Sequence, residues 1–236
     1  MIFRDKNGFP VDQTKDGGDS AMRAGILGLF SMYFNQPPCE NNQIWYENQG
    51  ENNQIWYENQ GLMVRHPFDV PWNNSRNFTR DQMMCLISIM PKYVAKRVFW
   101  ATIKRGFFSQ NTERDYVGSK KYPWPHSFIN DKGQKETRLF DWADPLFPHH
   151  VGHIALCTGS PWLYPLFLLG VPLLALSCIF NQGGEQNQLQ CMVKVAGPWW
   201  VKFYKYCYRH WEMDTRRYWD SRNESEYAEM IIEGLK

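Results

Sequence analysis

Apolar residues recur at helical spacing in several segments of the chain, and no segment alternates like a strand for more than a few residues. In the first such segment they recur every three or four positions: Met22, Ile26, Leu29, Phe30 and Tyr33. This spacing places them on one face of a helix. Asp19 or Ser20 is expected to cap this helix, and Pro37-Pro38 is expected to end it.

Further helices follow from the same pattern. Thr79-Arg80-Asp81-Gln82 matches a capping box, in which the Thr and Gln side chains each satisfy a free backbone N–H group, and predicts a second helix start. Pro91 restarts the chain into a third helix. Later helices are expected over residues 186–210, with a break at Gly197-Pro198, and over about residues 211–232, where the sequence is highly charged.

Residues 145–184 contain no Asp, Glu, Lys or Arg, and Trp162 to Phe180 is an almost continuous apolar run. Its length is sufficient to cross a bilayer. It contains Pro165 and Pro172, however, and no Lys/Arg cluster flanks it. We therefore prefer a buried central helix, bent or restarted near Pro172, to a membrane segment.

Together these patterns predict an all-α fold in one domain over residues 1–236. The expected architecture is an antiparallel helical-hairpin bundle with long loops rich in Trp and Pro. The segment ENNQIWYENQG at residues 40–50 is repeated without change at 51–61. Two copies are too few for a repeat fold, so we place this duplication in a surface loop.

Composition narrows the class of protein. The net charge is +2, and the local excess of basic residues at 92–121 is typical of a solvated helix face. A nucleic-acid partner is therefore not expected. The six scattered Cys predict neither a disulfide scaffold nor a zinc site. The first residues lack an apolar leader, which favours a cytoplasmic location.

Three polar clusters lie just before expected helix starts: residues 16–20, 79–81 and 112–115. Capping alone accounts for each cluster singly. In a bundle of antiparallel hairpins, however, alternate helix starts gather at one end, and their loops then converge. Helix N-termini favour the ionised form of carboxylates placed there. This placement suits a catalytic base or nucleophile better than a proton donor.

The stretch from Arg138 to His153 adds Asp, Trp and His residues. It could supply metal ligands, but no established metal-binding spacing is present, and neither a metal nor a cofactor is predicted. His titrates near neutral pH, which suits acid–base chemistry. The candidate catalytic residues are Asp16, Asp19, Asp81, Glu113, Asp115, His126, Asp141, Asp144 and His149. The candidate substrate-binding residues are Arg23, Arg65, His66, Arg80, Arg114, Trp124 and Trp142.

Five segments carry a resemblance to known sequences: DGGDSAMRAGILGLF, NNSRNFTRDQMMCL, KRGFFSQNTERDYVG, KKYPWPH and FDWADPLFPHHVGHI. They resemble uncharacterised proteins of tailed bacteriophages over most of residues 10–230. That resemblance implies no activity, but it implies a location in the cytoplasm of an infected host cell or in a virion. More distantly, Asp-Gly-Gly-Asp-Ser and Thr-Arg-Asp-Gln, each heading a helix, are similar to helical-toroid carbohydrate enzymes. That likeness implies a partial (α/α) toroid and hydrolase or lyase chemistry.

Three hypotheses remain open. The first is a carbohydrate- or polysaccharide-directed enzyme, because aromatic faces beside Asp, Arg and His suit a sugar site, and paired carboxylates suit glycoside cleavage. The second is a non-enzymatic bacteriophage structural or accessory protein that binds a partner chain or a second copy of itself. The third is a membrane-associated protein acting through residues 162–180.

Overall fold

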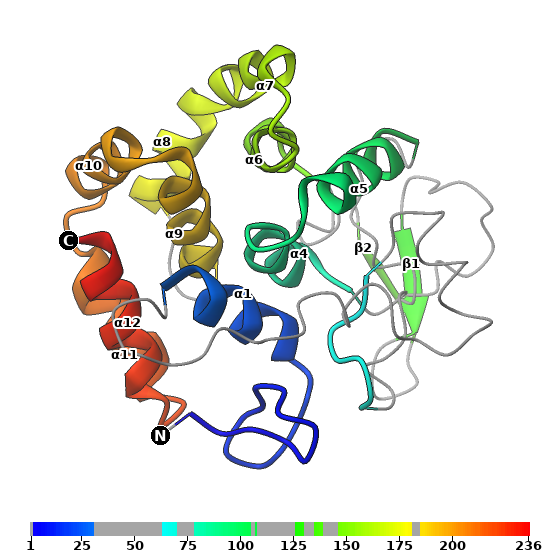
Figure 1. Ribbon diagram of the computed structural model, residues 1–236, viewed down its shortest axis with the longest axis vertical. Coiled ribbons are helices and arrows are strands. Elements are labelled where there is room, and N and C mark those ends of the chain that lie inside the picture. The colour runs from blue at the N-terminus through cyan, green and yellow to red at the C-terminus, as the bar shows by residue number, and fades with distance from the viewer. Residues whose placement is uncertain are drawn as a thin grey trace.

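The computed structural model describes residues 2–30, 63–69, 78–104, 107, 146–180 and 185–236, and the backbone of residues 126–129 and 135–138. Its helices are α1 (Ser20–Phe30), α4 (Arg80–Ile87), α5 (Lys92–Lys104), α6 (Pro148–Cys157), α7 (Tyr164–Leu169), α8 (Val171–Phe180), α9 (Glu185–Ala196), α10 (Pro198–Cys207), α11 (Trp211–Asp220) and α12 (Ser225–Leu235) (Figure 1). A 3₁₀ turn, Pro161–Leu163, precedes α7. The predicted all-α class is confirmed. The exception within the described residues is a short antiparallel hairpin, β1 (His126–Ile129) with β2 (Lys135–Arg138).

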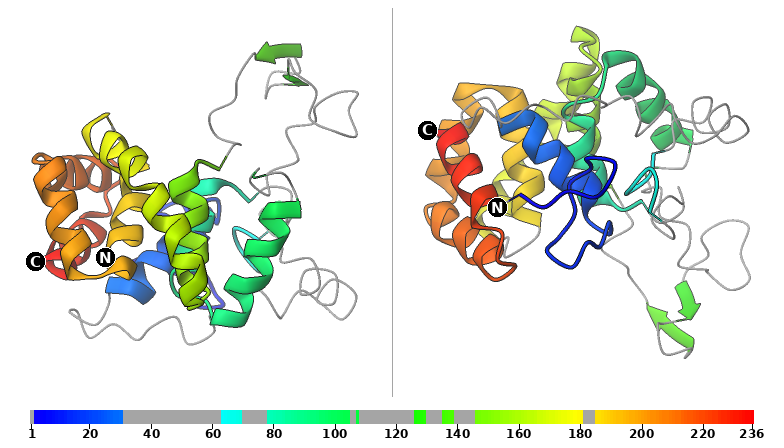
Figure 2. Two further views of the ribbon diagram at one scale, coloured as in Figure 1. Left: turned by 90° about the horizontal axis from the view of Figure 1, so that it is seen from above. Right: turned by 60° about the horizontal axis from the view of Figure 1, so that its bottom comes forward.

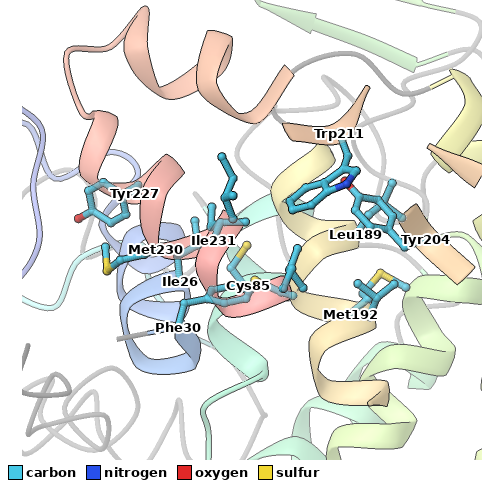
Figure 3. Close-up of a cluster of buried hydrophobic side chains, with 14 of the residues drawn as sticks. Ile26, Phe30, Cys85, Leu189, Met192, Tyr204, Trp211, Tyr227, Met230 and Ile231 are labelled. Atoms are coloured by element: carbon cyan, nitrogen blue, oxygen red, sulfur yellow. The ribbon is translucent and has the colours of Figure 1, made fainter. Parts of the chain in front are cut away.

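Helix α9 lies in the middle of the described helices and packs against helices from both halves of the chain, among them α1, α4, α6, α10 and α12 (Figures 1 and 2). Its apolar residues, including Leu189 and Met192, enter a hydrophobic core with Phe30 of α1 and Ile231 of α12 (Figure 3). A second core joins α4, α5 and α6. The partial toroid stays a prediction.

Two glycines permit the closest helix contacts. A Cβ atom on Gly25 of α1 would lie 2.3 Å from the backbone oxygen of Cys85 in α4. A Cβ atom on Gly152 of α6 would lie 2.5 Å from the Cα atom of Phe167 in α7. Since real Cβ atoms do not approach backbone atoms so closely, these pairs of helices depend on glycine for their spacing.

The apolar run is bent near Pro172, as predicted, but it is not buried on all sides. It forms two helices, α7 and α8, on either side of Gly170, and the segments Pro161–Leu169 and Val171–Ile179 are bent by 47°. Within the described residues no single helix is long and apolar enough to cross a membrane, although this bent pair qualifies by length and composition. Phe167 and Leu174 are buried, but Leu169 is 73% exposed. The prediction of a buried central helix is therefore wrong for the outward side of the pair.

Of two further helix predictions, one is confirmed and the other is wrong. The expected break is confirmed at Gly197, which has a φ of 109° between α9 and α10. The expected single helix over residues 211–232 is wrong, because a turn at residues 221–224 divides it into α11 and α12. Asn223 adopts a positive φ of 56° in this turn. Asn tolerates this conformation better than most residues, so it suits the position.

Candidate functional site

Five helices begin close together. Gln82 of α4 reaches α1, where its Oε1 atom accepts a hydrogen bond of 2.9 Å from the backbone N–H of Met22. Arg80 of α4 lies beside the first turn of α6, its guanidinium 6.0 Å from the ring centre of Phe147. His150 of α6 is hydrogen-bonded to Gln188 in the first turn of α9. Helix α12 joins through Glu224, described below. The starts of these helices are therefore linked one to the next, from α9 through α6, α4 and α1 to α12.

We call the polar network at these linked helix starts the helix-entrance site. Its members come from four separate parts of the chain: Gly18, Asp19, Arg65, Thr79, Asp81, Gln82, Tyr218 and Arg222.

Asp19 precedes α1 and has two partners in the site. Its Oδ1 atom accepts a hydrogen bond of 2.9 Å from Gln82, and its Oδ2 atom is 2.7 Å from Nη1 of Arg222. The Arg222 guanidinium in turn lies 4.5 Å from the ring centre of Tyr218. The Asp19 side chain is 27% exposed. Asp19 is therefore held as the partner of an arginine while one side of it remains open to solvent.

Asp81, in the first turn of α4, belongs to the same network. The Thr79 hydroxyl donates a hydrogen bond to its Oδ1 atom. Arg65 links this group to the loop before α1, because it donates to Thr79 at 3.0 Å and to the Gly18 carbonyl at 3.2 Å. Asp81 is partly buried. The two carboxylates, from different helix starts, thus belong to two neighbouring hydrogen-bonded groups that the backbone joins at Gly18-Asp19 and at Asp81-Gln82.

The predicted capping box does not form. Thr79 makes no side-chain capping hydrogen bond to its own helix. The Gln82 side chain instead satisfies an N–H group in the first turn of α1, one of those that a helix leaves unpaired. The expected capping box within α4 is thus replaced by a capping hydrogen bond from α1 to a side chain of α4.

A buried ion pair lies beneath the site. Arg23 of α1 contacts the Glu224 carboxylate through two nitrogens, Nε at 3.0 Å and Nη2 at 2.9 Å. The two side chains are 3% and 1% exposed. Asp19, one helical turn before Arg23, pairs with Arg222 instead. The prediction that Arg23 binds substrate is wrong for this structure, because the guanidinium is enclosed.

The histidines of α6 are structural. Burial, with a smaller contribution from the nearby Arg80 guanidinium, lowers the pKa of His149 to about 4. Burial likewise lowers the pKa of His153 to about 4, while its hydrogen bond to the Met84 carbonyl acts in the opposite direction. Burial also lowers the pKa of His150. His149 is only 4% exposed, so its predicted role in acid–base catalysis is not supported by its position.

His66 has a comparable structural role. Its Nδ1 atom accepts hydrogen bonds from the backbone N–H groups of Phe68 and Asp69, at 3.0 and 2.8 Å, and its Nε2 atom lies 3.1 Å from Asp5. Burial lowers its pKa despite the neighbouring carboxylates. His66 is 1% exposed and Arg80 is 6% exposed. Neither is therefore placed to contact a substrate, which corrects both predictions.

Of the remaining candidates, two lie within the described residues and seven lie outside them. Asp16 is exposed, and its Oδ1 atom accepts a hydrogen bond of 2.7 Å from the Gly18 N–H in the loop beside the site. His126 begins β1, where its backbone pairs with Arg138. Seven candidates lie outside the described residues: Glu113, Arg114, Asp115, Trp124, Asp141, Trp142 and Asp144. The 40–61 duplication lies outside them too.

Sequence reasoning missed Arg222, Tyr218 and Gln82 as members of the site. Arg222 and Tyr218 lie in a charged segment that predicts a continuous solvated helix, so no local signal separated them. Asn223 offered the available clue, because Asn favours turns. Within the described residues, no group of three or more His, Cys, Asp or Glu has an arrangement that could hold a metal ion.

Comparison with known proteins identifies no relative. No protein-family model, no curated protein and no solved structure matches the chain.

Proposed function

We propose that the protein is a carbohydrate-directed enzyme whose substrate binds at the helix-entrance site. The observation that carries this proposal is the placement of Asp19 and Asp81 at two helix starts that contact each other. Two partly exposed carboxylates, from two helix starts, share a network with two arginines and a tyrosine. Paired carboxyl groups are what most glycoside hydrolases use to cleave the bond between sugars.

The surroundings give the two carboxylates different roles. Asp19, paired with Arg222, is the proposed nucleophile or general base: its carboxylate attacks the sugar carbon or activates a water molecule. Asp81 is the second carboxyl group, held by a hydroxyl donor rather than by a direct ion pair. Burial raises the pKa of Tyr218, so its hydroxyl keeps its proton and serves as a hydrogen-bond donor to a sugar.

The linked helix starts and the two arginines also favour an acidic sugar. A uronate carboxylate is an anion, and helix N-termini and Arg groups both bind anions. The same groups would support elimination from a uronate, the lyase alternative. Trp124 and Trp142, predicted to stack on sugar rings, belong to this proposal as well.

A screen of the full chain against neutral and uronate-containing polysaccharides tests the function. Hydrolysis is expected to release reducing ends, whereas elimination adds an unsaturated product that absorbs in the ultraviolet. Asp19→Asn and Asp81→Asn are each expected to lower the rate at least about 100-fold, the usual contribution of a general acid or base.

Asp16→Asn is the matched control, because Asp16 is an exposed aspartate in the same loop whose bond to the site goes to the Gly18 backbone N–H and to neither carboxylate. It should retain the parent rate. If a polysaccharide binds without being cleaved, the reaction is refuted and only the binding site stands. If Asp16→Asn loses as much activity as Asp19→Asn, the assignment of the carboxylate pair is wrong.

A further inference from the structure

The outward side of α7 and α8 carries large apolar side chains in contact with solvent. The exposed fractions are 73% for Leu169 and 50% for Leu176, and 66% for Trp162 in the 3₁₀ turn that leads into α7. Leu168, Leu173 and Ile179 are also exposed. The opposite side of the same helices, including Phe167 and Leu174, is enclosed in the core. These helices therefore have two apolar sides, of which the protein itself covers one.

Helix α10 continues this surface. Trp199 and Tyr206 are 65% and 75% exposed. An open groove of about 620 Å³ connects α10 to the neighbouring helices, because Trp199 and Trp200 line it together with Tyr164 and Leu168. Figure 1 shows α7, α8 and α10 along one edge of the molecule. We call the exposed apolar side chains of these three helices the apolar face.

The apolar face is large for a protein surface. At the exposed fractions above, its aromatic and aliphatic side chains leave roughly 800 Å² open, given about 150–250 Å² for each aromatic side chain and somewhat less for Leu and Ile. The largest apolar patch of an ordinary soluble monomer is about 300–600 Å². A surface of this extent indicates that something else covers it.

Charge identifies the kind of partner. Along α10, exposed Lys202 lies between Trp199 and Tyr206 at helical spacing, and exposed Arg209 follows two residues after the helix ends. Residues 146–180 contain no acidic side chain, and neither do residues 186–211. Aromatic and basic residues around an apolar centre are typical of proteins that lie on membranes containing anionic lipids.

We propose that the apolar face docks onto the surface of an anionic lipid bilayer. The side chains of α7 and α8 enter the boundary between headgroups and acyl chains, which interfacial helices penetrate by about 5–10 Å. Lys202 and Arg209 meet the lipid phosphates, and Trp199 and Tyr206 lie at headgroup level. The chain rests on one leaflet, since the other side of α7 and α8 remains in the protein core.

A second copy of the chain fits this face less well. A two-fold contact would bring each apolar face against itself. The basic residues at its edge would then meet like charges, with no acidic residue on α7, α8 or α10 to neutralise them. This inference is independent of the proposed enzyme function, because it uses none of the residues of the helix-entrance site.

Flotation with lipid vesicles tests the proposal. The full chain, purified without detergent, is expected to bind vesicles of phosphatidylcholine with phosphatidylserine, and to bind pure phosphatidylcholine vesicles much less. The double variant Lys202→Gln/Arg209→Gln should weaken binding to the anionic vesicles about 20–30-fold, since each basic residue near such a surface contributes about fivefold. Added salt should weaken the parent in the same direction.

Helix α5 offers matched controls, because it also exposes a tryptophan and lysines. Trp199→Gln and Leu169→Gln should each reduce binding, whereas Trp100→Gln and Lys96→Gln/Lys104→Gln should not. Thermal melts of each variant show that it is folded. The proposal would be overturned if the α5 variants lost as much vesicle binding as the α7 and α10 variants. It would also be overturned if the parent bound vesicles equally well with and without phosphatidylserine. It would also be overturned by a dimer that Leu169→Gln dissociates in a protein that binds no vesicles.

Discussion

Acidification should destabilise the protein through the buried histidines of α6. Burial lowers the pKa of His149 and of His153 from 6.5 to about 4. Between these two pH values the unfolded chain binds protons that the folded protein excludes, so stability falls as the pH falls through this window. At pH 5 the loss is about 2 kcal/mol for each histidine and roughly 4 kcal/mol for both. Since domains are stable by about 5–15 kcal/mol, we expect the protein to be weakened but still folded at pH 5, and to unfold at lower pH.

Urea denaturation at about pH 7.5 and about pH 5 measures this loss as a change in the free energy of unfolding. The double variant His149→Gln/His153→Gln removes both titrating groups, and it should lose about 4 kcal/mol less than the parent between the two pH values. His210→Gln, which removes an exposed histidine, should show the parent's dependence. If the double variant and the parent lose the same free energy, the histidines are not the origin of acid sensitivity.

Three substitutions test the packing beneath the site. Gly25→Ala places a Cβ atom against the Cys85 backbone, and urea denaturation should show a loss of about 1–3 kcal/mol or more. Glu224→Gln leaves the Arg23 charge buried without its counter-charge, for a loss of about 3–5 kcal/mol, and Arg23→Met in the same chain should recover part of it. Asn223→Gly should leave the melting temperature unchanged or raised, whereas Asn223→Val should lower it, because φ is positive there. An unchanged midpoint for Gly25→Ala or Glu224→Gln would contradict the described packing.

The all-α class and many helix boundaries could be predicted because they depend on local signals. The three-to-four-residue spacing of Met22, Ile26 and Phe30 marks the buried side of α1, where all three are enclosed. Gly197 and Pro91 interrupt helices for reasons within their own backbones. The gathering of helix starts was also predictable in outline, because it follows from antiparallel neighbours.

The partners within the site could not be predicted in this way. Asp19 meets Arg222, and Gln82 caps a helix other than its own. Neither contact has a signature at fixed spacing, because each depends on how two distant segments pack. The exposure of α7 and α8 was missed for a related reason. An apolar sequence shows that a segment avoids water, but it does not show whether protein or lipid covers it.

The pairing of α1 with the turn before α12 has a consequence for biosynthesis. Arg23 lies 201 residues before Glu224, and Asp19 lies 203 residues before Arg222. While the ribosome makes the chain, α1 emerges long before the charges that neutralise it and before the α12 side chains that cover Phe30. Contacts between such distant residues slow folding. We therefore expect nascent chains stalled before residue 222 to remain sensitive to protease in α1, and protection to arise only once α12 has left the ribosome.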